Sequence, residues 1–166
     1  MKLTNKFIDI DFFPTRNLMY TGFCIKHTKR IIILINFDKH KKTFDGYSVF
    51  KSEEINKYRL WNKKDEKNIK NKNLQQFVNL KKLAKMKTFY SVLNSLEIDE
   101  FIAVFTKENL KEYDVGKILK VGKEFIHLKY IDKKGNWIRK SKLKISKINF
   151  FSFLTKYEKT LKNNAA

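Results

Sequence analysis

Three lysines near the end of the chain recur at every second position, Lys140, Lys142 and Lys144. On a strand, this spacing places the three ammonium groups on one face and Leu143 and Ile145 on the other. A ladder of like charges is unfavourable unless solvent or a bound anion relieves the repulsion. The spacing therefore predicts a sheet face that either binds an anion such as phosphate or is simply solvated.

Other basic residues gather at two turns and on a segment predicted to be a helix. The first turn reads Lys39-His40-Lys41-Lys42 and the second contains Lys133-Lys134. If two small barrels stand side by side, these turns form two basic rims along one continuous groove, and the helix adds lysines to its walls. The predicted nucleic-acid-binding residues are Lys39, His40, Lys41, Lys42, Lys81, Lys82, Lys85, Lys133, Lys134, Arg139, Lys140, Lys142 and Lys144.

Two aromatic side chains near these basic residues, Tyr47 and Trp137, are candidates for stacking on unpaired bases. Single-stranded nucleic acids are held by aromatic faces together with a positively charged groove. The same two residues could instead plug the end of a barrel, which is the commoner role of a large aromatic ring. The sequence leaves both interpretations open.

The composition favours a polyanionic partner. The 37 basic and 17 acidic side chains give a formal net charge of +20, and nearly all the basic residues are lysines. Lysine attracts phosphate as a point charge, whereas arginine reads bases through a planar fork, so contacts to a nucleic-acid backbone are expected. The single cysteine, Cys24, suits a reducing cytoplasm. Because no segment has the roughly 20 apolar residues that span a bilayer, no membrane partner is expected.

The sequence also contains an internal repeat. Placing residues 7–43 over residues 101–137 without a gap, an offset of 94, aligns many identical residues. After a slip of one residue the register returns and sets Glu54 and Ile55 beside Lys147 and Ile148. A duplicated small unit is the simplest interpretation. Identical pairs include Phe7 with Phe101, Gly22 with Gly116, Lys26 with Lys120, Ile32 with Ile126, Leu34 with Leu128 and Asp38 with Asp132.

The repeat argues against catalytic chemistry. Asp9 and Asp11 could be a general acid and base, but the second copy has Ala103 and Phe105 at these positions. Cys24 aligns with an isoleucine, which indicates a small buried hydrophobe rather than a nucleophile. The histidines lack the spacing of metal ligands, and no glycine-rich phosphate loop is present. We therefore expect no enzyme activity, no metal and no cofactor.

The pattern of apolar residues and turn residues predicts mainly strands, with helices between and after the two copies. In the first copy we expect strands at 7–13, 21–27, 30–37, 47–51 and 55–60, with a tight turn at Asp45-Gly46 before the fourth strand. In the second copy we expect strands at 101–105, 117–121, 125–131, 137–143 and 145–150, followed by a short helix at 152–162. Five short strands with tight turns favour a small, strongly bent barrel.

A charged stretch at 62–73 and a predicted helix at 74–96 separate the two copies. The apolar stripe of this helix changes side after Lys85, so the helix either breaks near 85–87 or packs its two halves on different copies. Both versions make it a bridge. The predicted organisation is a first barrel at 1–61, a linker and bridging helix at 62–97, and a second barrel with the short helix at 98–166.

The segment 22–60, with its Ile-Leu-Ile strand, charged loop and FDGYSVF, resembles small bacterial proteins made of tandem Sm-like or SH3-like barrels. The segment GKILKVGKEFIHLKYIDKKGNW followed by KISKINFFSFLTKYEKTL looks like their second copy. The resemblance implies an α+β, mainly β fold of two barrels and a tendency to bind RNA. The uridine-pocket residues of the Sm-like class have no match here.

These observations predict a non-catalytic cytoplasmic protein that binds RNA or single-stranded nucleic acid through phosphate contacts. One alternative is a protein-binding inhibitor or accessory factor of phage or mobile-element type, which docks on a ribonucleoprotein such as a CRISPR effector. A second alternative is an immunity protein for an acidic toxin. The expected assembly is a monomer or dimer, because the tandem arrangement already uses strand edges that would otherwise pair between chains.

Overall fold

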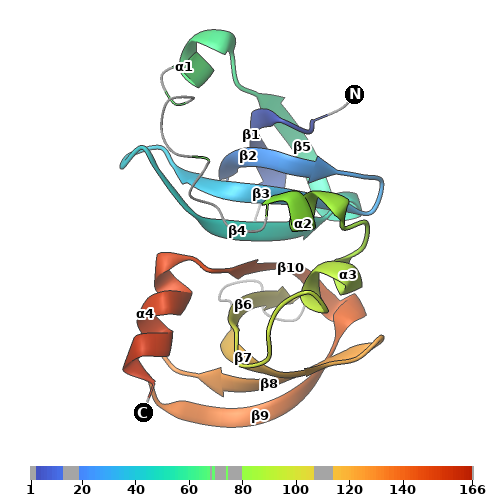
Figure 1. Ribbon diagram of the computed structural model, residues 1–166, viewed down its shortest axis with the longest axis vertical. Coiled ribbons are helices and arrows are strands. Elements are labelled where there is room, and N and C mark those ends of the chain that lie inside the picture. Colours follow the sequence, from blue (N-terminus) through green and yellow to red (C-terminus); the bar gives the residue numbers. More distant parts are fainter. Residues whose placement is uncertain are drawn as a thin grey trace.

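The computed structural model describes residues 3–12, 19–67, 69, 74, 80–106 and 114–165. Within them, strands dominate and helices fill the middle and the end of the chain, so the mainly β, α+β class is confirmed (Figure 1). The strands of the first half are β1 Lys6–Phe12, β2 Met19–His27, β3 Ile31–Asp38, β4 Thr43–Lys51 and β5 Ile55–Leu60. Those of the second half are β6 Phe101–Thr106, β7 Asp114–Val121, β8 Phe125–Ile131, β9 Trp137–Lys144 and β10 Ile148–Phe153.

All ten strands belong to one antiparallel sheet with the order β5-β1-β2-β3-β4-β10-β6-β7-β8-β9. The predicted pair of closed barrels is not confirmed, because the sheet stays open at β5 and β9. Each half pairs its own first and last strands, β1 with β5 and β6 with β10, but within the described residues β4 does not pair with β5, nor β9 with β10. Instead the edge of β4 pairs with β10 of the other half. Aromatic side chains at this junction, such as Phe50 opposite Phe150 and Tyr47 opposite Phe153, stabilise the continuous sheet.

The two halves share one set of strand pairings. Phe7 lies opposite Phe23, and Phe101 opposite Lys117, with the same offset of 94. The bulge after Cys24 recurs in the second half, where β7 pairs with β8. From β4 onward the offset is 93, since the paired residues Ile131 and Trp137 are one residue closer in sequence than their counterparts Phe37 and Phe44. We call two residues counterparts when they occupy the same place in these pairings.

Two of the predicted local features have different positions. Asp45-Gly46 lies inside β4, because the turn is at 39–42. Gly46 has a φ of +63°, and a Cβ there would lie 2.5 Å from the backbone nitrogen of Thr155. The last strand begins at Ile148 rather than 145, because a 3-10 turn, Ile145–Lys147, precedes it. The division into segments 1–61, 62–97 and 98–166 stays a prediction.

The predicted bridging helix is broken. The described part contains α2, Leu80–Lys85, and α3, Phe89–Leu93, while residues 75–79 lie outside the described residues. Thr88 starts α3, because its extended backbone lets its hydroxyl accept a hydrogen bond from the backbone N–H of Ser91. The break thus falls where the apolar stripe changes side. The remaining helices are α1 Lys63–Lys67 and α4 Lys156–Asn164.

The largest core lies between the halves. Ile33 and Val49 on one face of the first-half sheet pack in it with Leu83 of α2 and Phe89 of α3. The same cluster continues through Phe151 into the inner face of the second half. Where the chain is described, none of its helices has both the length and the apolar character needed to cross a membrane.

Candidate nucleic-acid interface

The lysine ladder lies on β9, at the outer edge of the sheet (Figure 1). Lys140, Lys142 and Lys144 are exposed, whereas Ser141 and Leu143 between them are half-buried, as the alternation predicted. β9 is a strand edge whose charged side chains oppose pairing with another strand.

The neighbouring strands extend this ladder into a basic surface. On β8, Lys129 lies opposite Lys140 and His127 opposite Lys142. On β7, Lys117 lies opposite Lys129 and Lys120 opposite His127. With strands about 4.8 Å apart and a rise of about 3.3 Å per residue, these side chains cover roughly 10 by 13 Å of sheet. We call this surface the basic sheet face; it consists of Lys117, Lys120, His127, Lys129, Lys140, Lys142 and Lys144.

Two aromatic rings lie among these cations. The ammonium nitrogen of Lys129 is 4.1 Å from the ring centre of Trp137, and that of Lys142 is 4.1 Å from the ring centre of Phe125. Trp137 is half-buried and packs on Phe101. Of the two predicted stacking residues, Trp137 therefore lies at the border of the basic sheet face.

Tyr47 has a different position. Its side chain is only 2% exposed, and its ring stacks on Phe153 at 5.1 Å. Burial at this junction also raises the pKa of its hydroxyl to about 12. Tyr47 consequently presents no ring face to a base, because β10 of the second half covers it.

The same places in the first-half sheet carry mostly apolar side chains. Five of the seven counterparts are apolar or aromatic, and only two are lysines. The first-half face is covered by α2 and α3, whereas the basic sheet face carries exposed lysines. The counterparts are Phe23 for Lys117, Lys26 for Lys120, Ile33 for His127, Ile35 for Lys129, Tyr47 for Lys140, Val49 for Lys142 and Lys51 for Lys144.

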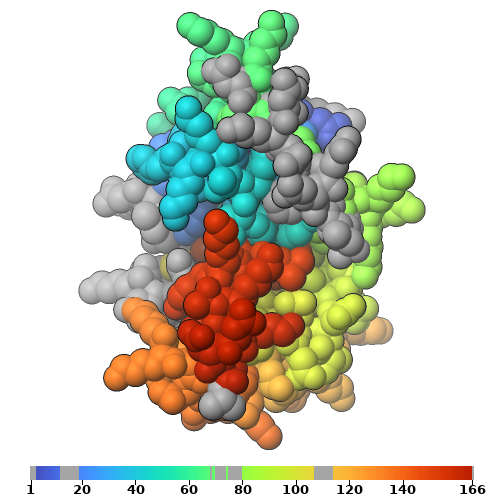
Figure 2. All heavy atoms as spheres, turned by 60° about the vertical axis from the view of Figure 1, so that its left-hand side comes forward, coloured from blue at the N-terminus to red at the C-terminus, as the bar shows by residue number. Residues whose placement is uncertain are grey.

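The two basic turns are exposed but do not adjoin each other. α4 begins beside β4, where the backbone N–H of Lys156 donates to Asp45 at 2.7 Å. It ends beside the turn of Lys133 and Lys134, where Gly135 lies against Asn164. Figure 2 shows α4 in red between the cyan turn of the first half and the orange strands of the second. The single groove expected between two rims is thus occupied by a helix about 13 Å long.

Aspartates hold both turns by accepting hydrogen bonds from the backbone. Asp38 accepts hydrogen bonds from the backbone N–H groups of His40 and Lys41, at 2.9 and 3.0 Å. These bonds are the main cause that lowers the pKa of Asp38. Asp132 accepts from Lys134 and Asn136, both at 2.8 Å. The backbone of both turns is therefore held in place, while their lysine side chains stay exposed.

The remaining predicted residues lie on the other face of the sheet. Lys81, Lys82 and Lys85 are exposed on α2, which packs on the first-half face, and Lys82 donates to the backbone oxygen of Ser95. Arg139 alternates with Lys140 on β9, and its guanidinium lies over the Tyr130 ring. Of the thirteen predicted cations, the basic sheet face gathers only the three lysines of the β9 ladder.

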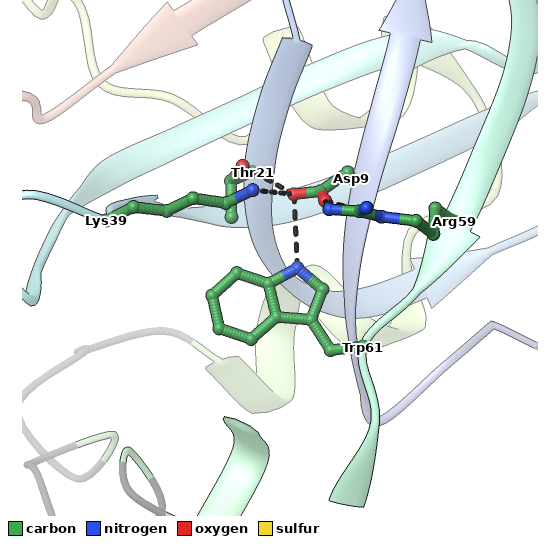
Figure 3. A network of polar contacts seen from close by, with 5 residues as sticks. All are labelled: Asp9, Thr21, Lys39, Arg59 and Trp61. Carbon is green, nitrogen blue, oxygen red and sulfur yellow. Dashed lines mark hydrogen bonds and ion pairs between the residues drawn. The ribbon is translucent and has the colours of Figure 1, made fainter. Parts of the chain in front are cut away.

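A network around a buried carboxylate was missed by sequence reasoning (Figure 3). Asp9 accepts from Lys39 at 2.8 Å, Thr21 at 2.6 Å, Trp61 at 3.1 Å and Arg59 at 2.7 Å. Burial alone would raise the pKa of Asp9, but these hydrogen bonds hold it lowered to about 2. The only signal in the sequence was that Asp9 and its partner Arg59 differ from their counterparts.

Comparison with protein-family models, curated proteins and solved structures finds no match for this chain. In the described residues, histidine, cysteine and carboxylate side chains form no group of three or more that could hold a metal ion. Cys24 is buried, and burial raises the pKa of its thiol to about 12. Among the described residues, the basic sheet face is where cations of three neighbouring strands gather.

Proposed function

We propose that this protein binds RNA or single-stranded nucleic acid through the basic sheet face, by phosphate contacts and without catalysis. The observation that carries the proposal is the replacement of five apolar or aromatic side chains of the first half by lysine or histidine in the second. Solvent exposure alone requires only polar side chains on this face, and does not explain why all five replacements are lysine or histidine. Asp99 already pairs with Lys117 at 2.7 Å, but the other cations of the face repel one another, and a polyanion relieves that repulsion.

Lysine supplies affinity without reading bases. The face contains six lysines and one histidine but no arginine. Lysine is a flexible point charge, so the expected recognition depends on the backbone rather than on sequence. Trp137 and Phe125, at the border of the face, add ring surfaces on which bases can stack.

Salt dependence and a charge reversal test this proposal together. Labelled single-stranded RNA, matched DNA and a duplex are titrated at two salt concentrations against the wild type and the Lys140→Glu/Lys142→Glu/Lys144→Glu variant. Six neutralised phosphates would give a slope of about −4 for log affinity against log salt, and loss of three would lower its magnitude by about 2.

The matched control reverses three exposed lysines of α1, Lys63, Lys64 and Lys67, at the opposite end of the molecule from β9 (Figure 1). It alters the net charge equally, so a local interface predicts a smaller loss of affinity than the β9 variant shows. Equal losses of affinity in both variants would mean that the net positive charge of the protein attracts nucleic acid without a local interface. Negligible affinity for every polymer would contradict the proposal and favour an acidic protein or a ribonucleoprotein as the partner.

A further inference from the structure

The two halves provide an internal control for the Asp9 network. The second half forms the same strand pairs without it, because the counterparts of the network residues are almost all unable to form it. The fold therefore does not require the network, and its presence in one half only points to a local role. The counterparts are Ala103 for Asp9, Val115 for Thr21, Ser152 for Arg59, Leu154 for Trp61 and Lys133 for Lys39.

The network places its negative charge inside and its positive charges outside. Asp9 is fully buried, whereas the side chains of Arg59 and Lys39 are 71% and 40% exposed. One carboxylate thus fixes two cations and leaves one positive charge in excess. A guanidinium has five N–H donors, and Asp9 accepts from the Nε and Nη2 groups of Arg59. The cations are positioned in advance, which lowers the entropy lost when an anion binds.

Lys42 supplies a third cation in an unfavourable backbone conformation. Its φ is +52°, in the left-handed region that residues with a Cβ rarely adopt. The counterpart that ends the corresponding turn is Gly135, with a φ of +92°. Glycine is the residue this position favours, so Lys42 adopts its conformation at a cost in backbone free energy.

These residues meet at one cleft. Its volume is about 600 Å³, and it is lined by Lys39, Lys42, Arg59 and Trp61, with Phe37 among the apolar lining residues and Asp65 as a lining carboxylate. Sites for small molecules usually have volumes of about 300–1,000 Å³ and combine apolar walls with a few polar groups. The indole of Trp61 is held by its hydrogen bond to Asp9, so the aromatic wall is fixed as well as the cations.

We propose that this cleft binds a single nucleoside phosphate unit, with the phosphate on Arg59 and Lys42 and the base against Trp61. An anion and a flat ring joined within one small molecule match the cations and the indole that line the cleft. The unit could be a free nucleotide or the phosphorylated end of a strand. The cleft shares no residue with the basic sheet face, so either site can exist without the other.

Fluorescence of Trp61 provides the test. The Trp137→Phe variant leaves Trp61 as the only tryptophan, and it is titrated with adenosine monophosphate, adenosine and inorganic phosphate at constant ionic strength. We expect a saturable change with the nucleotide, and affinities at least about tenfold weaker for adenosine or phosphate alone. Short oligonucleotides with and without a 5′-phosphate, competed against the nucleotide, then distinguish a strand end from a free nucleotide.

Lys42→Gly is the decisive variant, because it removes the cation and relieves the backbone at once. We expect at least about tenfold weaker nucleotide binding together with an unchanged or higher melting temperature. Arg59→Ser, which introduces the counterpart residue, should weaken binding similarly. The matched control is Lys41→Ala, which removes an equal charge from the same turn at a residue that does not line the cleft.

Several outcomes would overturn this inference. They are the absence of a saturable signal at the highest soluble nucleotide concentration, equal affinity for phosphate alone, and a nucleotide affinity that Lys42→Gly leaves unchanged. The variant with Lys140, Lys142 and Lys144 changed to Glu should keep its nucleotide signal. If it does, the two sites are independent, and a failure of the basic sheet face to bind RNA would not contradict nucleotide binding in the cleft. Conversely, a cleft that binds no nucleotide would not contradict RNA binding by the basic sheet face.

Discussion

The first-half face that α2 and α3 cover and the basic sheet face share one backbone arrangement, but the first carries mostly apolar side chains and the second carries cations. Ile33 pairs with Val49 beneath α2 and α3, whereas the counterparts His127 and Lys142 pair on the open side of the second half. The strand order and bulges are shared, so the backbone does not dictate which face is covered. Side-chain polarity alone decides it: an apolar face must be buried, and a charged face must stay in solvent or meet an anion.

The largest loss of stability is expected when a residue of the basic sheet face replaces its counterpart on the buried first-half face. Val49→Lys introduces the counterpart residue at a fully buried position. An ammonium group without a partner in that core should lower the free energy of unfolding by about 3–5 kcal/mol. Urea unfolding of the variant measures the loss. A variant as stable as the wild type would mean that α2 and α3 do not seal the first-half face.

At Gly46 the two halves differ because a neighbouring backbone segment leaves no room for a side chain in the first half. The chain at 153–155 passes so close that a Cβ on Gly46 would lie 2.5 Å from the nitrogen of Thr155, whereas its counterpart Arg139 lies on the outermost strand. Gly46→Ala should therefore cost about 2–3 kcal/mol, from the positive φ and from the contact. Thermal unfolding tests this against Gly122→Ala, whose Cβ would only approach an oxygen at 3.3 Å. Equal losses would argue against the close approach.

Much of the fold followed from local sequence patterns. The strands at 55–60 and 125–131 have the bounds that alternation and turn residues predicted, because side-chain period and turn chemistry act over a few residues. The open sheet did not follow, because it depends on the pairing of β4 with β10, about a hundred residues apart. Periodicity carries no information about such a pairing. Tyr47, for which the sequence left base stacking and a barrel plug open, instead stacks on Phe153 at this junction.

The candidate site was predicted only in its local part. The β9 ladder is visible as a spacing of two, but the contribution of Lys129 and His127 requires the pairing of β8 with β9. The Asp9 network joins β1, the turn after β3 and the end of β5, so no sequence window contains it. Burial of a carboxylate is also improbable from sequence alone, because it depends on all its partners being present.

The Asp9 network should make the stability of the first half depend on acid pH. Its pKa in the folded protein is about 2, against an ordinary value of 3.8. A lowered folded-state pKa stabilises the protein above the unfolded value, and this contribution disappears as the pH falls through about 2. The shift corresponds to about 2 kcal/mol at neutral pH.

Asp9→Asn measures this contribution directly. Urea unfolding should show the variant about 2 kcal/mol less stable than the wild type at neutral pH, with the difference shrinking toward zero near pH 2. Asp11→Asn, on the same strand and bonded to Asn56 at 3.1 Å, is the control and should change stability less. A pH-independent difference for Asp9→Asn would indicate lost packing rather than lost charge.

The smallest effect on stability is expected when a first-half residue replaces its counterpart on the basic sheet face, the reverse of Val49→Lys. Lys142→Val places the first-half residue on the open face, at an exposed strand position where valine is favoured and no buried partner is lost. The free energy of unfolding should change by no more than about 0.5 kcal/mol. If the face binds phosphate, the salt slope for single-stranded RNA should fall in magnitude by about 0.7. A stable variant with an unchanged salt slope would mean that Lys142 is only a solvated charge. A reduced salt slope at unchanged stability would mean that Lys142 serves binding and not folding, as the difference between the two faces implies.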